Sequence, residues 1–199
     1  MEEEVVTVSD ITEVDALDLS RMIHAREVSC VEVMRAFLAR ITAENAWANA
    51  IVSMRPEDEL LSEAAIADQE LAAGRSRGWM HGFPQAIKDL AEARDIPFTQ
   101  GSPIYRETVG GKDAPFVAKM RRAGAIFIGK TNTPEFGLGS HTYNPVFGPT
   151  HNAYRQGLSA GGSSGGAAVA LALRMLPVAD GSDHAGSPRN PAAFNNVFG

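Results

Sequence analysis

The residues of this chain best suited to chemistry are one lysine and several serines that lie in or beside glycine-rich loops. Lys88 ends a short apolar segment, residues 84–89, and two serine-bearing loops follow at residues 161–166 and 181–187. A serine hydroxyl is a weak nucleophile until a base removes its proton. A lysine can act as that base only where burial and its neighbours keep the amine neutral. The set therefore indicates nucleophilic catalysis by a serine if the fold brings the three segments together.

A second motif, at residues 124–131, matches the phosphate-binding pattern G-x-x-x-x-G-K-[ST]. That loop needs a flexible turn whose N–H groups surround phosphates, with the Lys-Thr pair opening a helix. Here the middle residues are the bulky apolar run Ala125-Ile126-Phe127-Ile128, which predicts a buried strand, and Pro134 follows closely. We therefore expect a strand and a turn here, with Lys130 in a structural role.

A third motif, Gly161-Gly162-Ser163-Ser164-Gly165, matches the G-x-S-x-G nucleophile elbow. An elbow follows directly after a strand and needs histidine and acid partners further along the chain. Residues 154–160 do not predict a convincing strand, and the one histidine downstream is His184, inside another glycine-bearing loop. A Ser-His-Asp triad on this serine is therefore disfavoured.

Composition separates the chain into two parts. Among its 199 residues, 18 Lys and Arg against 24 Asp and Glu give a net charge of −6, which argues against a general nucleic-acid binder. Residues 1–73 carry 16 acidic and 5 basic side chains and no glycine, which predicts an acidic helical layer. All 19 glycines lie in residues 74–199, where the charge is +5 and the candidate loops occur.

The same sequence bounds location and cofactors. Met1-Glu2-Glu3-Glu4 is the opposite of a basic signal-peptide start, and no apolar run approaches membrane-spanning length. A cytoplasmic protein without a membrane partner is the default expectation. The single cysteine, Cys30, excludes a disulfide framework and a multi-cysteine metal site, and we expect no metal and no cofactor. Cys30 itself is expected to be a small buried side chain.

The positions of polar, apolar and proline residues predict the elements that must hold the chemistry. Ser29 and Glu32 form a capping box before an amphipathic helix over residues 30–45. Further helices are predicted at 17–25, 56–73, 114–123 and 167–173, with the second of these opening at Pro56. Strands are predicted at 50–54, 84–89, 125–128 and 176–179. Strands alternating with helices indicate an α/β fold with a mixed, largely parallel sheet flanked by helices.

Taken together, four ordered segments resemble the amidase signature family. The resemblance runs from about residue 82 to residue 199, and its motifs are residues 83–89, 129–136, 159–166 and 181–191. It implies a Ser–cisSer–Lys triad with Ser187 as the nucleophile, Ser163 as the bridging serine after a cis peptide bond, and Lys88 as the base. It also implies a backbone oxyanion hole within four consecutive residues: His184, Ala185, Gly186 and Ser187. Ser164 and Asp183 are expected to support the loops, and Arg189 to act as a strut.

Three positions depart from the family pattern. Ala185 stands where a glycine is usual, and a β-carbon there could tilt an oxyanion donor. Pro188 replaces an aliphatic residue, removes an N–H group and restricts Ser187. His184 occupies a position that is usually small or apolar, and a catalytic role for it is disfavoured.

The resemblance implies an amidohydrolase that cleaves a carboxylic amide through an acyl-enzyme on Ser187, with a small-molecule amide as substrate and a homodimer as one option for assembly. It also implies that residues 1–199 are one partial amidase domain, because family members continue beyond this point. Two alternatives stay open at this stage. One is the glutaminase-type component of an amidotransferase that amidates mischarged tRNA, and the other is an inactive truncated fragment.

Overall fold

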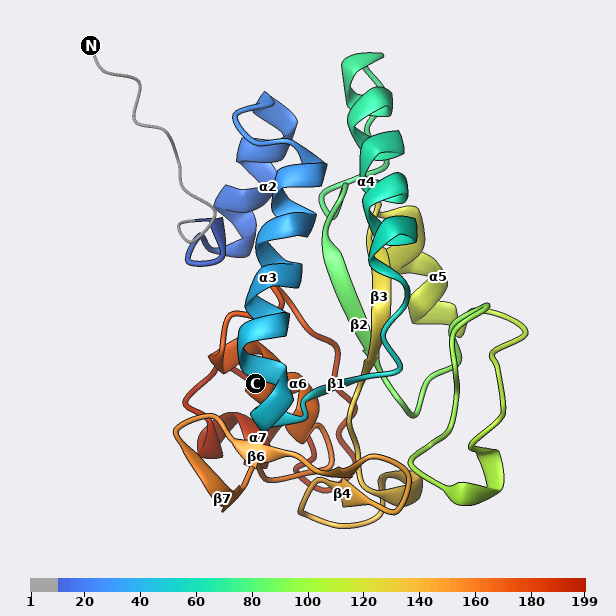
Figure 1. Ribbon diagram of the computed structural model, residues 1–199, viewed down its shortest axis with the longest axis vertical. Coiled ribbons are helices and arrows are strands. Elements are labelled where there is room, and N and C mark those ends of the chain that lie inside the picture. The colour runs from blue at the N-terminus through green and yellow to red at the C-terminus, as the bar shows by residue number, and fades with distance from the viewer. Residues whose placement is uncertain (1–10) are drawn as a thin grey trace.

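The computed structural model describes residues 11–199, and the acidic segment Met1-Glu2-Glu3-Glu4 therefore lies outside the described residues. In Figure 1, the long helices of the first third of the chain stand beside a small sheet, and the later loops and short hairpins gather at one end. Among the described residues, no helix is both long and apolar enough to cross a membrane.

Within residues 11–73, the structure describes three helices in the segment where an acidic helical layer is expected. They are α2 (Ala16–Ala25), α3 (Cys30–Ala48) and α4 (Glu57–Ala72). The capping box is confirmed: the Ser29 hydroxyl accepts the Glu32 N–H, and the Glu32 carboxylate accepts the Ser29 N–H. Pro56 lies just before α4, whose first turn is acidic and therefore suits a helix N-terminus. Cys30 is fully buried, and burial raises the pKa of its thiol well above the ordinary range.

The central sheet is mixed, as predicted, and places Lys88 at its edge. Its strands are β1 (Ile51–Val52), β2 (Pro84–Lys88) and β3 (Ile126–Thr131), in the order β1-β3-β2. Strand β2 runs parallel to β3 and pairs Lys88 with Thr131, whereas β1 runs antiparallel to β3. Both β2 and β3 are buried along their whole length, because α3, α4 and α6 pack against them.

Strand β3 shows which structure the motif at residues 124–131 adopts. Its residues include Lys130 and Thr131, which a phosphate-binding loop would need at the start of a helix. Lys130 is fully buried and donates a hydrogen bond to the Ala91 carbonyl, and its amine lies 3.6 Å from the Asp89 carboxylate. The prediction that this motif is a strand with a structural lysine is confirmed.

Short elements connect the main ones. After β2 come a 3-10 turn at Pro103–Tyr105 and α5 (Pro115–Arg122), and after β3 a second 3-10 turn at Glu135–Gly137. Two small hairpins follow, built from β4 (Tyr143–Asn144), β5 (Gly148–Pro149), β6 (His151–Asn152) and β7 (Arg155–Ser159). The chain then forms α6 (Gly165–Ala172) and α7 (Arg189–Phe194).

Two sequence-based expectations about strands were wrong. Residues 176–179 form no strand: Pro177 has no N–H group, and the segment packs its apolar side chains on the core without pairing with β2. Conversely, residues 155–159, where no convincing strand is expected, form β7. Within residues 11–199 this strand is largely exposed and pairs only with β6, so local hairpin pairing holds it, and burial contributes little. It does not make Ser163 an elbow nucleophile, because β7 ends at Ser159 and an elbow follows directly after its strand.

The capping box allows a test of the helical layer. We expect Ser29→Ala to lower the free energy of unfolding by about 1 kcal/mol, because the Glu32 N–H loses its side-chain acceptor. Urea denaturation followed by circular dichroism measures the change. Ser62→Ala, at an exposed position inside α4, is the matched control and should leave the midpoint nearly unchanged. Equal losses in the two variants would contradict the assignment of the cap.

Candidate active site

The Lys88 amine lies at the centre of a group of serine hydroxyls. Its Nζ is 2.7 Å from the Ser163 hydroxyl, 2.8 Å from that of Ser164 and 3.0 Å from that of Ser182. Lys88, Ser163 and Ser164 are each only 2% exposed. Two of these contacts join residues that are 75 and 76 positions apart in the chain. The fold therefore brings together the lysine and the first serine loop that the sequence singled out.

Burial gives this lysine the properties of a base. Desolvation disfavours the ammonium form and lowers the pKa of Lys88 to about 8, against an opposing pull from the carboxylates of Asp180 and then Asp183. Hydroxyl groups can accept from an ammonium or donate to a neutral amine, so the three serines fit either charge state. A substantial fraction of Lys88 is thus neutral at slightly alkaline pH and able to accept a proton.

The loop before α6 holds Ser163 and Ser164 against the sheet. The Gly162–Ser163 peptide bond is cis, as the family resemblance implies. Helix α6 begins at Gly165, two residues earlier than predicted. A Cβ at Gly166 would collide with the backbone nitrogen of Asn132 and lie 2.6 Å from the Ala50 oxygen, so only glycine lets the loop approach the strand ends this closely.

The loop that carries Ser187 is closed by an acid and an arginine. The Asp183 carboxylate accepts two hydrogen bonds from the Arg189 guanidinium, at 2.9 and 3.0 Å, and one from the Gly186 N–H at 2.6 Å. Hydrogen bonding to Arg189 holds the pKa of Asp183 well below its ordinary value. Asp183 and Arg189 therefore fix the loop on both sides of Ser187.

The departures from the family pattern are accommodated in this loop. The left-handed conformation falls on Gly186, with φ at 98°, and Ala185 is not among the residues with positive φ. The β-carbon at 185 therefore meets no left-handed backbone strain. Pro188 stands directly before α7 with φ −81° and ψ −44°, a position where its missing N–H costs no helical hydrogen bond.

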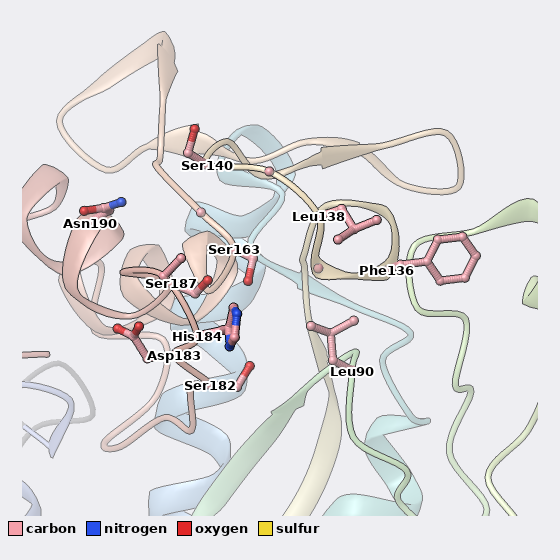
Figure 2. Close-up of a pocket in the computed structure, with 14 residues that line it drawn as sticks. Leu90, Phe136, Leu138, Ser140, Ser163, Ser182, Asp183, His184, Ser187 and Asn190 are labelled. Atoms are coloured by element: carbon pink, nitrogen blue, oxygen red, sulfur yellow. The ribbon is translucent and has the colours of Figure 1, made fainter.

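Ser163 and Ser187 line the same cavity, which has a volume of about 600 Å³. Figure 2 shows Ser163, Ser182, His184 and Ser187 on one side of it, with Leu90 on the opposite side. The Ser187 carbonyl accepts the Ser164 N–H at 3.0 Å, which anchors the nucleophile candidate beside the first loop. The Ser163 and Ser187 hydroxyls form no hydrogen bond with each other in this structure. Such contacts are often loose before a substrate binds.

The four backbone N–H groups expected to form an oxyanion hole differ in whether they already donate a hydrogen bond. The Gly186 N–H donates to Asp183 and is therefore occupied. The N–H groups of His184, Ala185 and Ser187 have no partner within residues 11–199, and all three residues line the cavity. The His184 ring likewise forms no hydrogen bond within that part of the chain, so nothing in the geometry gives it a catalytic partner.

Sequence reasoning missed two residues that touch Lys88. Ser182 supplies a third hydroxyl to the amine, and Asp180 accepts the Lys88 backbone N–H with both carboxylate oxygens, at 3.1 and 3.3 Å. Both positions directly flank Gly181, just after the segment wrongly predicted as a strand. Polar residues on either side of a glycine, directly after an apolar run, were the available signal. Within residues 11–199, no group of three or more His, Cys, Asp and Glu side chains is arranged to hold a metal ion.

With this geometry in place, comparison with known proteins identifies the family. The family model named Amidase matches residues 32–199. The chain belongs to the Amidase family. It is 43% identical over 191 residues to a glutamyl-tRNA(Gln) amidotransferase subunit from Acidothermus cellulolyticus, a match that covers 96% of this chain and 38% of that protein. It is 39% identical to an acylamidase of Rhodococcus erythropolis, covering 92% of this chain and 38% of that one.

Solved structures agree with the family assignment and the α/β fold. A fatty acid amide hydrolase superposes with a TM-score of 0.88 at 29% identity, covering 93% of this chain and 32% of that structure. The proteins similar to this chain thus include an amide-hydrolysing enzyme. This chain spans about two fifths of the length of the curated relatives it matches.

The closure of the Ser187 loop can be tested by amide hydrogen exchange. In Asp183→Ala the Gly186 N–H loses a charge-assisted hydrogen bond, and we expect its exchange to accelerate about tenfold or more. Asp113→Ala is the matched control, because Asp113 also accepts a backbone N–H, that of Arg94, and pairs with an arginine. That control should speed exchange at Arg94 and leave Gly186 unchanged. Unaltered exchange of the Gly186 N–H in Asp183→Ala would contradict the role of Asp183 in closing the Ser187 loop.

Proposed function

We propose that the protein carrying this chain is an amidase that hydrolyses a carboxylic amide C–N bond through an acyl-enzyme on Ser187. The observation that carries the proposal is the buried Lys88 amine in contact with the Ser163 hydroxyl, beside a cavity that Ser163 and Ser187 share. Family membership supports the reaction class. A small-molecule amide is the proposed substrate, and the proposal needs neither a metal nor a cofactor.

The proposed reaction begins with proton transfer along the two serines. Neutral Lys88 accepts the Ser163 proton, Ser163 accepts the Ser187 proton, and the Ser187 oxygen attacks the amide carbonyl carbon. We propose that the resulting oxyanion accepts from the N–H groups of His184, Ala185 and Ser187, which have no partner within residues 11–199. Such donors typically contribute about 3 kcal/mol each to the stability of the transition state.

Collapse of the tetrahedral intermediate then breaks the C–N bond. The proton held by the relay passes to the leaving nitrogen, so an amine departs and an ester remains on Ser187. Water gives a proton back to the relay and attacks this ester, which releases the carboxylic acid and restores the Ser187 hydroxyl. In this scheme Ser164 and Ser182 keep the Lys88 amine in place, and Asp183 holds the loop around Ser187.

We also propose that residues 1–199 form part of a single amidase domain: an acidic helical layer in residues 1–73 and the region of the catalytic motifs in residues 74–199. The coverage of only 38% of the relatives' length supports this, and it makes the full-length protein the right material for every activity assay.

The central prediction concerns the nucleophile. In the full-length protein, we expect Ser187→Ala to lower the turnover of a simple aryl amide by about 10⁴-fold or more, because no acyl-enzyme can form. Release of the aryl amine followed by absorbance measures the rate. A serine-directed phosphonate should label wild-type protein at Ser187, as shown by mass spectrometry. Ser62→Ala, on the exposed face of α4, is the control and should retain activity. Undiminished turnover in Ser187→Ala would sink the proposal.

A second candidate function is favoured by relatives that share more than 40% identity with this chain. The matching protein of Acidothermus cellulolyticus belongs to a glutamyl-tRNA(Gln) amidotransferase, and the present protein would then be a glutaminase-type component that delivers ammonia to mischarged tRNA. Affinity purification of the full-length protein from its source, followed by activity assays, distinguishes the two candidate functions. Co-purifying partner proteins and a kcat/KM for glutamine at least tenfold above that for aryl amides would establish the amidotransferase component. A lone protein with the opposite preference would establish the amidase.

A further inference from the structure

Within residues 11–199, the Asp180 carboxylate lies at the edge of the sheet beside Lys88, where no strand pairs with β2. Strand β2 lies at the edge of the order β1-β3-β2, so the Lys88 N–H faces away from β3 and needs a partner outside the sheet. The neighbouring segment, residues 176–179, provides no strand pairing. Instead, both oxygens of the Asp180 carboxylate accept the Lys88 N–H, at 3.1 and 3.3 Å. In this part of the chain, a side chain takes the place of a strand as the acceptor of the Lys88 N–H.

The same carboxylate contributes to the charge balance around the lysine amine. The groups facing the Lys88 amine are the hydroxyls of Ser163, Ser164 and Ser182, the Ser182 carbonyl, and, at longer range, the carboxylates of Asp180 and Asp183. Of the two carboxylates, Asp180 exerts the larger pull toward the charged amine.

The surroundings of Asp180 determine its pKa through opposing effects. Burial raises the pKa of Asp180 to about 6, while the Lys88 N–H and the positive charges of Lys130 and Lys88 oppose that rise. Lys130 is paired with Asp89, whose carboxylate also accepts from Thr99. At neutral pH Asp180 is therefore predominantly ionised, next to a lysine that must lose its charge to work.

We propose that Asp180 is a positioning residue for Lys88, which fixes the backbone at the end of β2 and, through its negative charge, sets the pH at which the Lys88 amine becomes neutral. The inference rests on the proposed function, in which neutral Lys88 is the base. Asp180 touches neither Ser163 nor Ser187 through a hydrogen bond within residues 11–199, so it acts through the lysine.

The sign of the effect follows from the charge. An anion near the amine stabilises the ammonium form and keeps the pKa of Lys88 higher than burial alone would. Removing the anion therefore favours the neutral amine at lower pH. Activity that depends on neutral Lys88 rises tenfold per pH unit below the pKa and levels off above it. Without the Asp180 charge, this rise should occur at lower pH.

The experiment is the pH profile of kcat/KM for an aryl amide, measured with the full-length protein. Wild-type activity should rise with pH to a plateau, with a midpoint of about 8. In Asp180→Asn, which keeps an acceptor oxygen but loses the charge, we expect the rise to move by about one pH unit toward acid. Relative to its own plateau, activity at about pH 6.5 should then increase about tenfold. Asp180→Glu, which keeps the charge, should retain the wild-type midpoint.

Asp68→Asn is the matched control. Asp68, like Asp180, uses both carboxylate oxygens to accept backbone N–H groups, but these belong to Cys30 and Val31 at the start of α3. The substitution should leave the midpoint unchanged even if it lowers stability. Asp180→Ser provides a second neutral variant with a small acceptor, should Asp180→Asn fail to fold. Circular dichroism establishes folding in each case.

The outcomes separate this inference from the proposed function. If Ser187→Ala leaves amide hydrolysis intact in otherwise wild-type protein, the proposed function fails before Asp180 is considered. If hydrolysis depends on Ser187 and a folded neutral variant keeps the wild-type midpoint, the inference about Asp180 is overturned. It is also overturned if both neutral variants fail to fold while Asp180→Glu folds, because the carboxylate would then serve stability alone.

Discussion

The candidate site depends on the burial of one lysine amine. An amine in water is charged and has no capacity to accept a proton, and only withdrawal from solvent brings the neutral form within reach of ordinary pH. Here the amine is enclosed by hydroxyl groups, which satisfy its hydrogen bonds without forcing a charge on it. Carboxylates at longer range limit how far the pKa of Lys88 falls. The balance between desolvation and these anions is what the remaining structure must maintain.

The rest of the fold makes that balance rigid. Strand β2 is buried along its length and paired with β3, so the backbone of Lys88 has little freedom. Next to it, Lys130 and Asp89 form a buried ion pair. Lys130 also donates to the Ala91 carbonyl, and Asp89 also accepts from the Thr99 hydroxyl. The two serine loops are each fixed by a different device. Close backbone approach at Gly166 holds the first, and the Asp183–Arg189 pair holds the second.

Sequence reasoning succeeded where the controlling interactions are local or where several motifs combine. The capping box at Ser29, the buried strand that ends in Lys130-Thr131, and the proximity of Lys88 to Ser163 were all predicted. It failed for residues 176–179, because an apolar run that packs on a core and one that joins a sheet have the same composition. It also failed for Asp180 and Ser182, whose importance lies in what they touch across more than 90 positions of sequence. The local pattern marks polar residues beside Gly181, but it does not show that they contact Lys88.

The distance along the chain between the lysine and its serines has a consequence for the timing of synthesis and folding. Lys88 leaves the ribosome 75 residues before Ser163 and longer still before Ser187. Until those later loops pack over it, its amine is an ordinary solvated, protonated lysine that cannot take a proton from a hydroxyl. Contacts of such long range form late, because the intervening chain must first lose its conformational freedom. The neutral form of the Lys88 amine therefore comes within reach of ordinary pH only once these distant segments have packed over it. The chemistry of this one side chain is thus coupled to the packing of segments far along the sequence.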